Sequence, residues 1–263
     1  EAIAANGYKV ALPTGYEKKD HLLTGWKIQG TDDPFTAETV VGADTYVVPV
    51  TVPAYWVTFN TDGGSSVPSK YVAKGESVNI GAIPPPTKLG YKFAGWYLGE
   101  QQITGAYAPT ASVVLKAHWT AAPVDYTIVY WGENADDTNY SVLAIEYGQN
   151  ATGTVLHSSD KKTLPDGTTD SQHFDFNSAK NETVTIAADG SSVLNVYFTR
   201  KTYTLTFKDG RDIVATIEAK YDSDISYVWK NDPIKALLDQ GAVFKSSVTG
   251  KYYSFLQKMP GQN

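Results

Sequence analysis

The chain has 263 residues, a length that favours two or more domains over one. Hydrophobic residues make up 42% of it, but the sequence contains no run of 18 apolar residues that could span a bilayer. The net charge of −6 argues against nucleic-acid binding, which depends on a basic face. The chain has no cysteine, which excludes disulfides, thiol nucleophiles and thiolate metal sites.

The composition predicts a mostly β protein of the α+β class. The chain has 18 Tyr with many Thr and Val, residue types that favour strands. The first residues, Glu1 to Ala5, lack the basic region and apolar run of a signal peptide. We therefore expect the chain to be a segment of a longer protein.

Three segments begin alike, with an alternating strand that runs into a turn rich in Gly, Asp or Asn. They start at Val57, Tyr126 and Tyr203, about 70 and 77 residues apart, which is close to the size of one small domain. Short linkers separate the segments, so we expect tandem modules in an extended arrangement. The predicted modules are 1–56 (a partial or divergent unit), 57–120, 126–200 and 203–263.

Tryptophan recurs at matched places in the first two predicted modules. Trp26 and Trp96 each follow a glycine, and Trp56 and Trp119 each end a β-like run. In the second of these runs, alternation puts Trp119 on the same face as Leu115 and Ala117. Because the repeat places all four Trp, we predict that they anchor the cores of small domains.

The last predicted module begins with a hairpin. Tyr203, Leu205 and Phe207 share one strand face, and Asp209-Gly210 supplies the turn. The return strand then has its own apolar face, which predicts a hairpin with one dry side. That second face is formed by Ile213, Ala215, Ile217 and Ala219.

A short helix is predicted after this hairpin. Asp232 can cap it, Pro233 fits the first turn, and Gly241 ends it. The apolar positions 234, 237 and 238 lie on one helical face. A helix laid across a small sheet is typical of a β-grasp module.

Residues 57–120 resemble a Listeria–Bacteroides repeat, also called an internalin B-type repeat, and residues 1–56 resemble a partial or divergent copy of it. The resemblance rests on three motifs, which span 57–64, 86–97 and 115–119. Residues 126–200 and 203–263 resemble related surface-protein repeats of the mucin-binding type, more loosely. These resemblances imply β-grasp-like modules in secreted or cell-wall-attached bacterial proteins, and they imply no catalytic residues.

The sequence shows no esterase elbow, zinc-protease motif, phosphate loop or dinucleotide fingerprint. His157 and His173, with Asp160 or Asp175, are the sharpest candidates for a metal or acid–base cluster. Scattered loop residues seldom converge on such a site, so we interpret them as polar loop positions. We accordingly predict no catalytic residue, no metal and no cofactor.

Two further features have both a functional and a plain interpretation. Glu133, Asn134, Asp136, Asp137 and Asn139 form an oxygen-rich loop that could hold Ca²⁺, but the EF-hand ligand order is absent. We therefore favour a solvated turn.

Asn195 lies on a strand side with Val193 and Tyr197, so it could face the core and form an isopeptide bond with a lysine. A buried Asn more often hydrogen-bonds to the backbone. No lysine and acid that would complete such a bond can be named from the sequence.

Trp131 and Trp229 have no matched position in another module, which makes them the candidate ligand-contact aromatics. We expect a non-enzymatic repeat region that serves as a stalk, an adhesion module or both. It would be monomeric and extracellular, with host glycans or extracellular proteins as partners. The alternatives are a glycan-binding module with a discrete aromatic platform, or an accessory region of a large secreted hydrolase.

Overall fold

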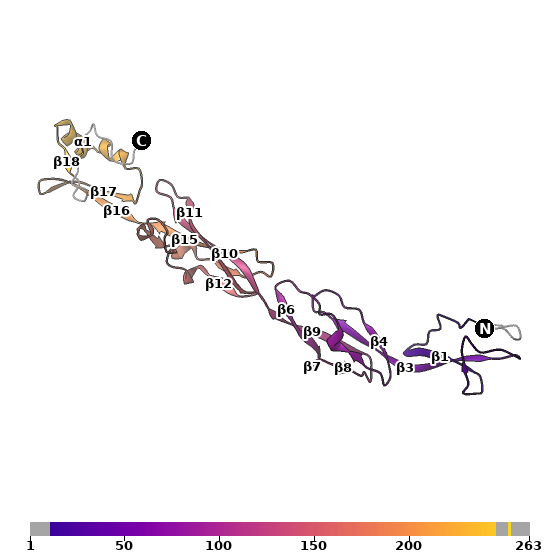
Figure 1. The fold of residues 1–263 in the computed structure, drawn as a ribbon. Helices are drawn as coiled ribbons and strands as arrows, with labels where there is room; N and C mark the ends of the chain where they lie inside the picture. Colours follow the sequence, from indigo (N-terminus) through magenta and orange to yellow (C-terminus); the bar gives the residue numbers. More distant parts are fainter. Residues whose placement is uncertain (1–10, 246–251, 254–263) are drawn as a thin grey trace. The chain divides into compact units, whose positions relative to one another are not determined.

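The computed structural model describes residues 11–245 and the short strand at 252–253 (Figure 1). The chain is mostly β, as its composition predicts. It divides into two compact units, Glu1–Ala122 and Pro123–Asn263. The expectation about the first five residues lies outside the described part of the chain. None of the described helices is long and apolar enough to cross a membrane.

The first unit is built around one sheet with strand order β2-β1-β3-β9-β6-β7, and β4 also pairs with β3. A second, two-stranded sheet pairs β5 with β8, next to a 3-10 turn at Ile80–Ala82. The strands are β1 His21–Ile28, β2 Pro34–Phe35, β3 Val47–Asn60, β4 Lys70–Ala73, β5 Val78–Asn79, β6 Tyr91–Leu98, β7 Gln101–Ile103, β8 Ala106–Tyr107 and β9 Val113–Ala121.

Strand β3 has 14 residues, and its two halves pair with different strands. Its first half pairs with β1 in the antiparallel sense, and its last four residues pair with β9 in the parallel sense. The predicted boundary between residues 56 and 57 therefore falls inside a continuous strand. Because the strand is continuous, the backbone passes from one set of pairings to the next without a loop.

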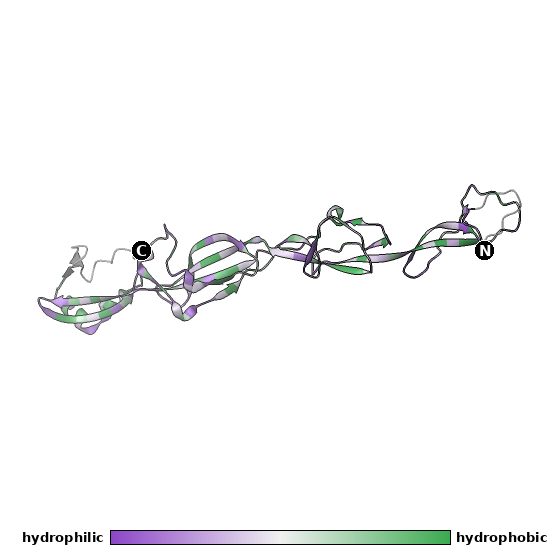
Figure 2. Cartoon of the chain, turned by 90° about the horizontal axis from the view of Figure 1, so that it is seen from below, coloured by the Kyte–Doolittle hydropathy of each residue, from purple (hydrophilic) through white to green (hydrophobic). Residues whose placement is uncertain are grey.

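The core of the first unit lies on one side of β3, β6 and β9. Val57, Leu115 and Ala117 are fully buried there, and Trp96 packs against Phe59 with ring centroids 4.7 Å apart. The alternation of hydrophobic and hydrophilic residues along the strands is visible in Figure 2. Period-2 alternation is what allows a sheet to bury one face.

The four matched Trp do not all anchor cores, and Trp56 contradicts the prediction. Trp96 is 3% exposed, and the half-buried Trp119 packs on the same core, but Trp56 is 47% exposed. Since Val57 points into the core, its neighbour Trp56 must point away from it. Trp56 lies instead against Tyr71, with ring centroids 4.6 Å apart. Trp26 is half-buried against Tyr16.

The second unit begins with a four-stranded sheet of order β11-β10-β15-β13 and a separate β12-β14 pair. As β3 does with β9, β10 pairs in parallel with the last strand of its module, β15. Its core is formed by Ile128, Tyr130, Leu194, Val196 and Phe198 with Phe174. The strands are β10 Pro123–Glu133, β11 Tyr140–Ala151, β12 Val155–His157, β13 Phe174–Phe176, β14 Thr183–Thr185 and β15 Ser192–Arg200. Three 3-10 turns lie at Ser158–Asp160, Ser171–His173 and Ser178–Lys180.

The predicted hairpin follows as β16 and β17, and the predicted helix as α1. Phe207, Ala215 and Ile217 pack with the helix residues Ile234 and Leu238, so the hairpin has the expected dry side. The elements are β16 Thr202–Asp209, β17 Asp212–Lys220, a 3-10 turn Ser226–Lys230, α1 Asp232–Asp239, β18 Phe244–Lys245 and β19 Tyr252–Tyr253.

Three details of this part differ from the prediction. Tyr203, predicted on the dry face, is 43% exposed. A register shift at Phe207/Lys208 pairs Lys208 with Ile213, so Ile213 leaves the dry face and is exposed. Asn231, not Asp232, occupies the N-cap position of the helix, without a capping bond from its side chain, and Asp232 is the first helical residue. The rest of the predicted module at 246–251 and 254–263 lies outside the described residues.

Candidate functional site: the junction within the second unit

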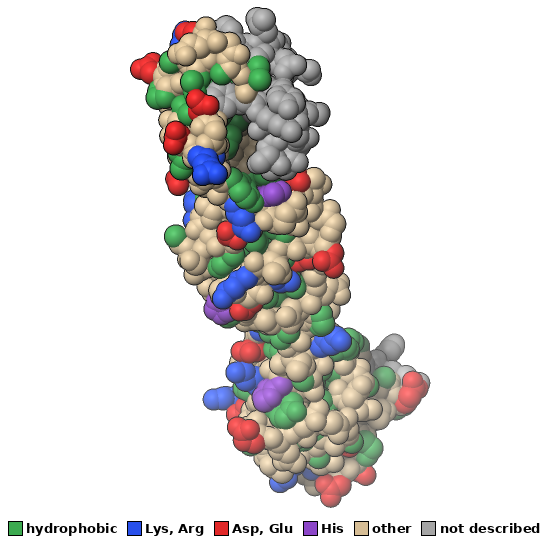
Figure 3. All heavy atoms as spheres, turned by 90° about the vertical axis from the view of Figure 1, so that its left-hand side faces the viewer, with side chains coloured by type: hydrophobic (Ala, Val, Ile, Leu, Met, Phe, Trp, Pro, Cys, Tyr) green, Lys and Arg blue, Asp and Glu red, His purple; other side chains and the backbone are tan. Residues whose placement is uncertain are grey.

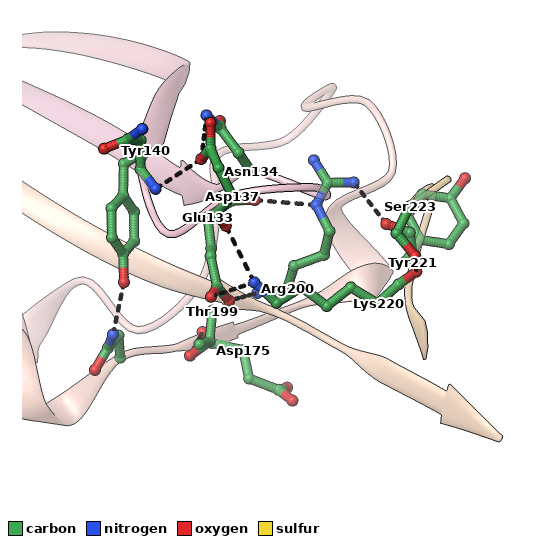
Figure 4. Close-up of polar contacts among 12 residues, drawn as sticks. Glu133, Asn134, Asp137, Tyr140, Asp175, Thr199, Arg200, Lys220, Tyr221 and Ser223 are labelled. Carbon is green, nitrogen blue, oxygen red and sulfur yellow. Dashed lines mark hydrogen bonds and ion pairs between the residues drawn. The ribbon is translucent and has the colours of Figure 1, made fainter. Parts of the chain in front are cut away.

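A polar and aromatic junction joins the β10–β15 sheet to the β16–β17 hairpin (Figure 4). Glu133 lies at its centre, at the end of β10, and both of its carboxylate oxygens are bound. Oε1 accepts from Lys220 Nζ at 2.7 Å, and Oε2 accepts from the backbone N–H of Arg200 at 3.1 Å. The Glu133 side chain is only 15% exposed and that of Lys220 30%, so this ion pair is largely shielded from water.

Arg200 lies at the last position of β15 and contacts both modules. Its Nε donates to the Glu133 carbonyl at 3.0 Å, and its Nη1 donates to the Tyr221 carbonyl at 3.2 Å. Its guanidinium lies over the Phe174 ring, 4.8 Å from the ring centre. A planar group with five donors suits such a position, because it can stack and donate at the same time.

The oxygen-rich loop between β10 and β11 is part of this junction. Asp137 Oδ1 accepts from the backbone of Asn139 at 2.7 Å and from Asn134 Nδ2 at 3.0 Å. These bonds, the Asn139 backbone bond first, lower the pKa of Asp137. Asp136 Oδ1 accepts from the backbone of Asp224 at 2.7 Å. Protein donors therefore occupy one carboxylate oxygen of Asp136 and one of Asp137 in the loop that had suggested Ca²⁺.

The two histidines of the sharper metal hypothesis have separate partners. His173 Nδ1 lies 2.8 Å from the Tyr203 hydroxyl, and its ring stacks on Tyr221 at 3.6 Å. His157 Nδ1 instead lies 3.1 Å from the Thr183 hydroxyl. Within the described residues, no group of three or more His, Asp or Glu side chains could hold a metal ion.

The junction is suited to holding two modules in a fixed orientation. Its charged groups are bonded to one another across the strand ends, and aromatic rings cover them. Sequence reasoning had not singled out Arg200, Lys220 or Tyr221. Their position next to predicted linkers or at strand ends was the available signal. The bonds themselves join Glu133 to residues 67 and 87 positions further along the chain, and contacts at such separations leave no local pattern in the sequence.

Trp131 belongs to a second cluster, on the outer face of the same sheet. Its ring stacks on Tyr197 at 6.4 Å, and Tyr140 meets Tyr197 edge-on at 5.1 Å. Lys180 Nζ lies about 5 Å from the centres of the Tyr140 and Tyr197 rings. Trp131 is half-buried, and its Nε1 donates to Asn195 Oδ1 at 2.9 Å.

Asn195 does not face the core, contrary to the expectation. Leu194 and Val196, on either side of it, point into the core, so Asn195 points to the outer face. Its Nδ2 and its backbone N–H both donate to Glu182 Oε2, at 3.1 and 3.2 Å. The Asn195 amide thus links Trp131 to Glu182.

Trp229, the other candidate aromatic, lies in the last part of the unit. It is half-buried against the core between the β16–β17 hairpin and α1, and it meets Phe207 edge-on at 6.1 Å. The structure therefore does not bring Trp131 and Trp229 into one cluster.

On the face shown in Figure 3, basic and acidic side chains are interspersed.

Residues 55–120 match the Listeria-Bacteroides repeat domain family. The match covers the second predicted module, which carries the motifs noted above. The chain is also 29% identical over 147 residues to a protein of Evansella cellulosilytica described as "Putative membrane protein". That alignment covers 53% of this chain and 21% of the relative, so the chain spans about a fifth of the relative's length.

A solved structure, "Crystal structure of Mub-RV", matches over 56% of this chain and 98% of its own, at 14% identity and a TM-score of 0.14. A similarity at that level carries no argument. The mucin-binding-type resemblance of the second unit therefore stays a prediction.

Proposed function

We propose that the chain is a non-enzymatic repeat region of a bacterial secreted or cell-wall-attached surface protein, which serves as a stalk, an adhesion module or both. The observation that carries this proposal is the junction around Glu133. A free linker lets neighbouring modules reorient, whereas this junction ties them together through a shielded ion pair and backbone bonds. A support that projects a binding tip needs junctions of this kind.

The comparisons support the proposed setting. The Listeria-Bacteroides repeat at 55–120 belongs to a repeat family, and the relative's printed name points to a membrane-associated protein. We infer an extracellular or cell-surface location, with host glycans or extracellular proteins as partners. The chain would act as a monomer that presents several modules.

The distance between spin labels on the two modules of the second unit tests this proposal. The chain has no native cysteine, so Lys162→Cys and Arg211→Cys introduce the only two label sites. Both residues are exposed, one in each module. We expect a narrow distance distribution in pulsed electron paramagnetic resonance. Glu133→Ala should broaden it, because Lys220 and the Arg200 backbone both lose their acceptor.

Asp175→Asn is the matched control. Asp175 pairs with Lys201 near the same junction at 3.3 Å, but its side chain is largely exposed. An exposed pair contributes little, so this variant should keep the narrow distribution. A broad distribution in the unaltered chain would contradict a fixed junction and remove the main support for the stalk.

A further inference from the structure

An open hollow of about 310 Å³ lies at the edge of the β10–β11 pair, away from the ends of these strands that form the junction. Its lining combines aromatic, apolar and charged groups. The lining residues are Tyr126, Ile128, Glu146, Tyr147 and Lys161. The volume lies at the lower end of the roughly 300–1,000 Å³ typical of small-molecule sites.

The aromatic part of this hollow is held in place by a glycine. Tyr126 pairs with Gly148 across the two strands, and its ring lies where a side chain at Gly148 would be. A β-carbon at Gly148 would come within 2.5 Å of Cζ and the hydroxyl of Tyr126. The ring therefore occupies the space that the missing side chain of Gly148 leaves over β11, and the half-buried Tyr126 side chain also lines the hollow.

In the polar part of the hollow, hydrogen bonds hold only one of the two carboxylate oxygens of Glu146. Glu146 Oε2 accepts from the buried Tyr130 hydroxyl at 2.6 Å and from Lys161 Nζ at 3.4 Å. Among the described residues, nothing donates to Glu146 Oε1, and the Tyr126 hydroxyl has no hydrogen-bond partner. Lys161 has three donors and uses one of them here. The hollow thus offers a free acceptor, free donors and a hydroxyl.

We propose that this hollow binds a neutral saccharide. The hydroxyls of a sugar both donate and accept, so they suit a carboxylate oxygen and an ammonium group held side by side. The flat ring of Tyr126 provides an apolar face for the C–H face of a pyranose. Because Glu146 and Lys161 neutralise each other, the hollow favours an uncharged ligand over an acidic one.

Two residues that line the hollow are held in place before any ligand binds. The buried Tyr130 hydroxyl holds Glu146, and the backbone of Gly148 supports Tyr126. A ligand would therefore meet groups whose conformational freedom is already restricted, which lowers the cost of binding. This inference rests on the proposed function, because an adhesion module would use a sugar-binding site.

Titration of the ¹⁵N-labelled full chain with lactose, maltose and chitobiose tests the proposal. Weak sugar sites have dissociation constants on the order of 1 mM, so each sugar should reach about 10 mM. We expect saturable shifts of the Tyr147 and Gly148 amides with at least one sugar. Glu146→Gln should weaken that binding about tenfold, because it removes the charge that accepts the sugar hydroxyl.

Glu146→Gln should fold, since the Gln side chain can still accept from Tyr130. Glu182→Gln is the control, because Glu182 is a carboxylate of the same module that does not line the hollow. It should bind the sugar as the unaltered chain does. The proposal is overturned if no sugar gives saturable shifts, if Glu146→Gln leaves the affinity unchanged, or if the acidic sugar sialyllactose binds more tightly. None of these results would alter the spin-label distances at the Glu133 junction.

Discussion

Glu133 and Lys220 are 87 positions apart in the sequence, yet their side chains form a 2.7 Å ion pair. Each lies at the end of a strand, one in the four-stranded sheet and the other in the following hairpin. The carboxylate also accepts from the backbone of Arg200, so one side chain satisfies donors from two modules. The second unit is thereby held together at a point where its modules share no strand pairing.

Glu133→Gln should destabilise the chain against urea, with a loss of about 2 kcal/mol in the free energy of unfolding. The Gln amide can still accept from Arg200, but the ammonium of Lys220 loses its charged partner in a shielded place. Hydrogen exchange of the Arg200 amide, which reports on the junction itself, should become faster. Unchanged exchange would show that the pair does not hold the junction.

Asp62→Asn provides the matched exposed pair. Asp62 lies 3.4 Å from Lys116 Nζ, and about half of each side chain is exposed. Solvent screening makes such a pair nearly neutral, so the loss should stay below about 0.5 kcal/mol. If both variants cost the same, burial would not be what gives the Glu133 pair its strength.

Trp96→Ala and Trp56→Ala should separate the two roles of the matched Trp residues. Trp96 is 3% exposed and contacts two phenylalanine rings, so its loss should cost about 3–5 kcal/mol in urea unfolding. Trp56 contacts Tyr71 on an exposed face, and its loss should cost about 1 kcal/mol. Equal costs would contradict the placement of the core on the Val57 side of β3.

The sequence predicted what depends on neighbours along the chain. The alternation at Leu115, Ala117 and Trp119, and the hairpin after Tyr203, need only local pattern, and both are confirmed. The repeat motif predicts the wrong side for Trp56, because the parity of its own strand, not its place in the repeat, decides where the side chain points. With Val57 buried, period-2 alternation already requires Trp56 to point outward.

The junction and the hollow could not be predicted in the same way. Glu133, Arg200 and Lys220 come from three strands, and no local rule fixes how those strand ends meet. The register shift at Tyr130/Trp131 likewise decides which residues of β11 face the core. Such shifts depend on the partner strand, so the hydrogen bond from the Tyr130 hydroxyl to Glu146 appears only in the folded chain.

Gly148→Ala should disturb the floor of the hollow. The added methyl group would lie 2.5 Å from two atoms of Tyr126, so the ring must move, at a cost of about 1–3 kcal/mol in urea unfolding. Gly105→Ala is the control, because nothing lies within 4 Å of its added carbon. Its cost should stay within about 0.5 kcal/mol. A neutral Gly148→Ala would mean that Tyr126 does not need the glycine.

Tyr130→Phe should reveal a dependence of stability on pH in the alkaline range. Burial, followed by the hydrogen bond to Glu146, raises the pKa of Tyr130 well above its ordinary value. The folded chain therefore keeps this phenol protonated at pH values at which the unfolded chain ionises it. The stabilisation is complete below the ordinary tyrosine pKa of about 10 and is lost as pH rises above it, by about 1.4 kcal/mol per pH unit.

The Phe variant lacks this titration, so it is the internal reference. Near neutral pH it should be about 1 kcal/mol less stable, because the bond to Glu146 is gone. From about pH 9 to about pH 11, the unaltered chain should lose this advantage and then become the less stable of the two. Urea unfolding of both chains across this range measures the difference. A difference that stays constant would show that Tyr130 ionises in the folded chain as readily as in the unfolded one, against its burial beneath Glu146.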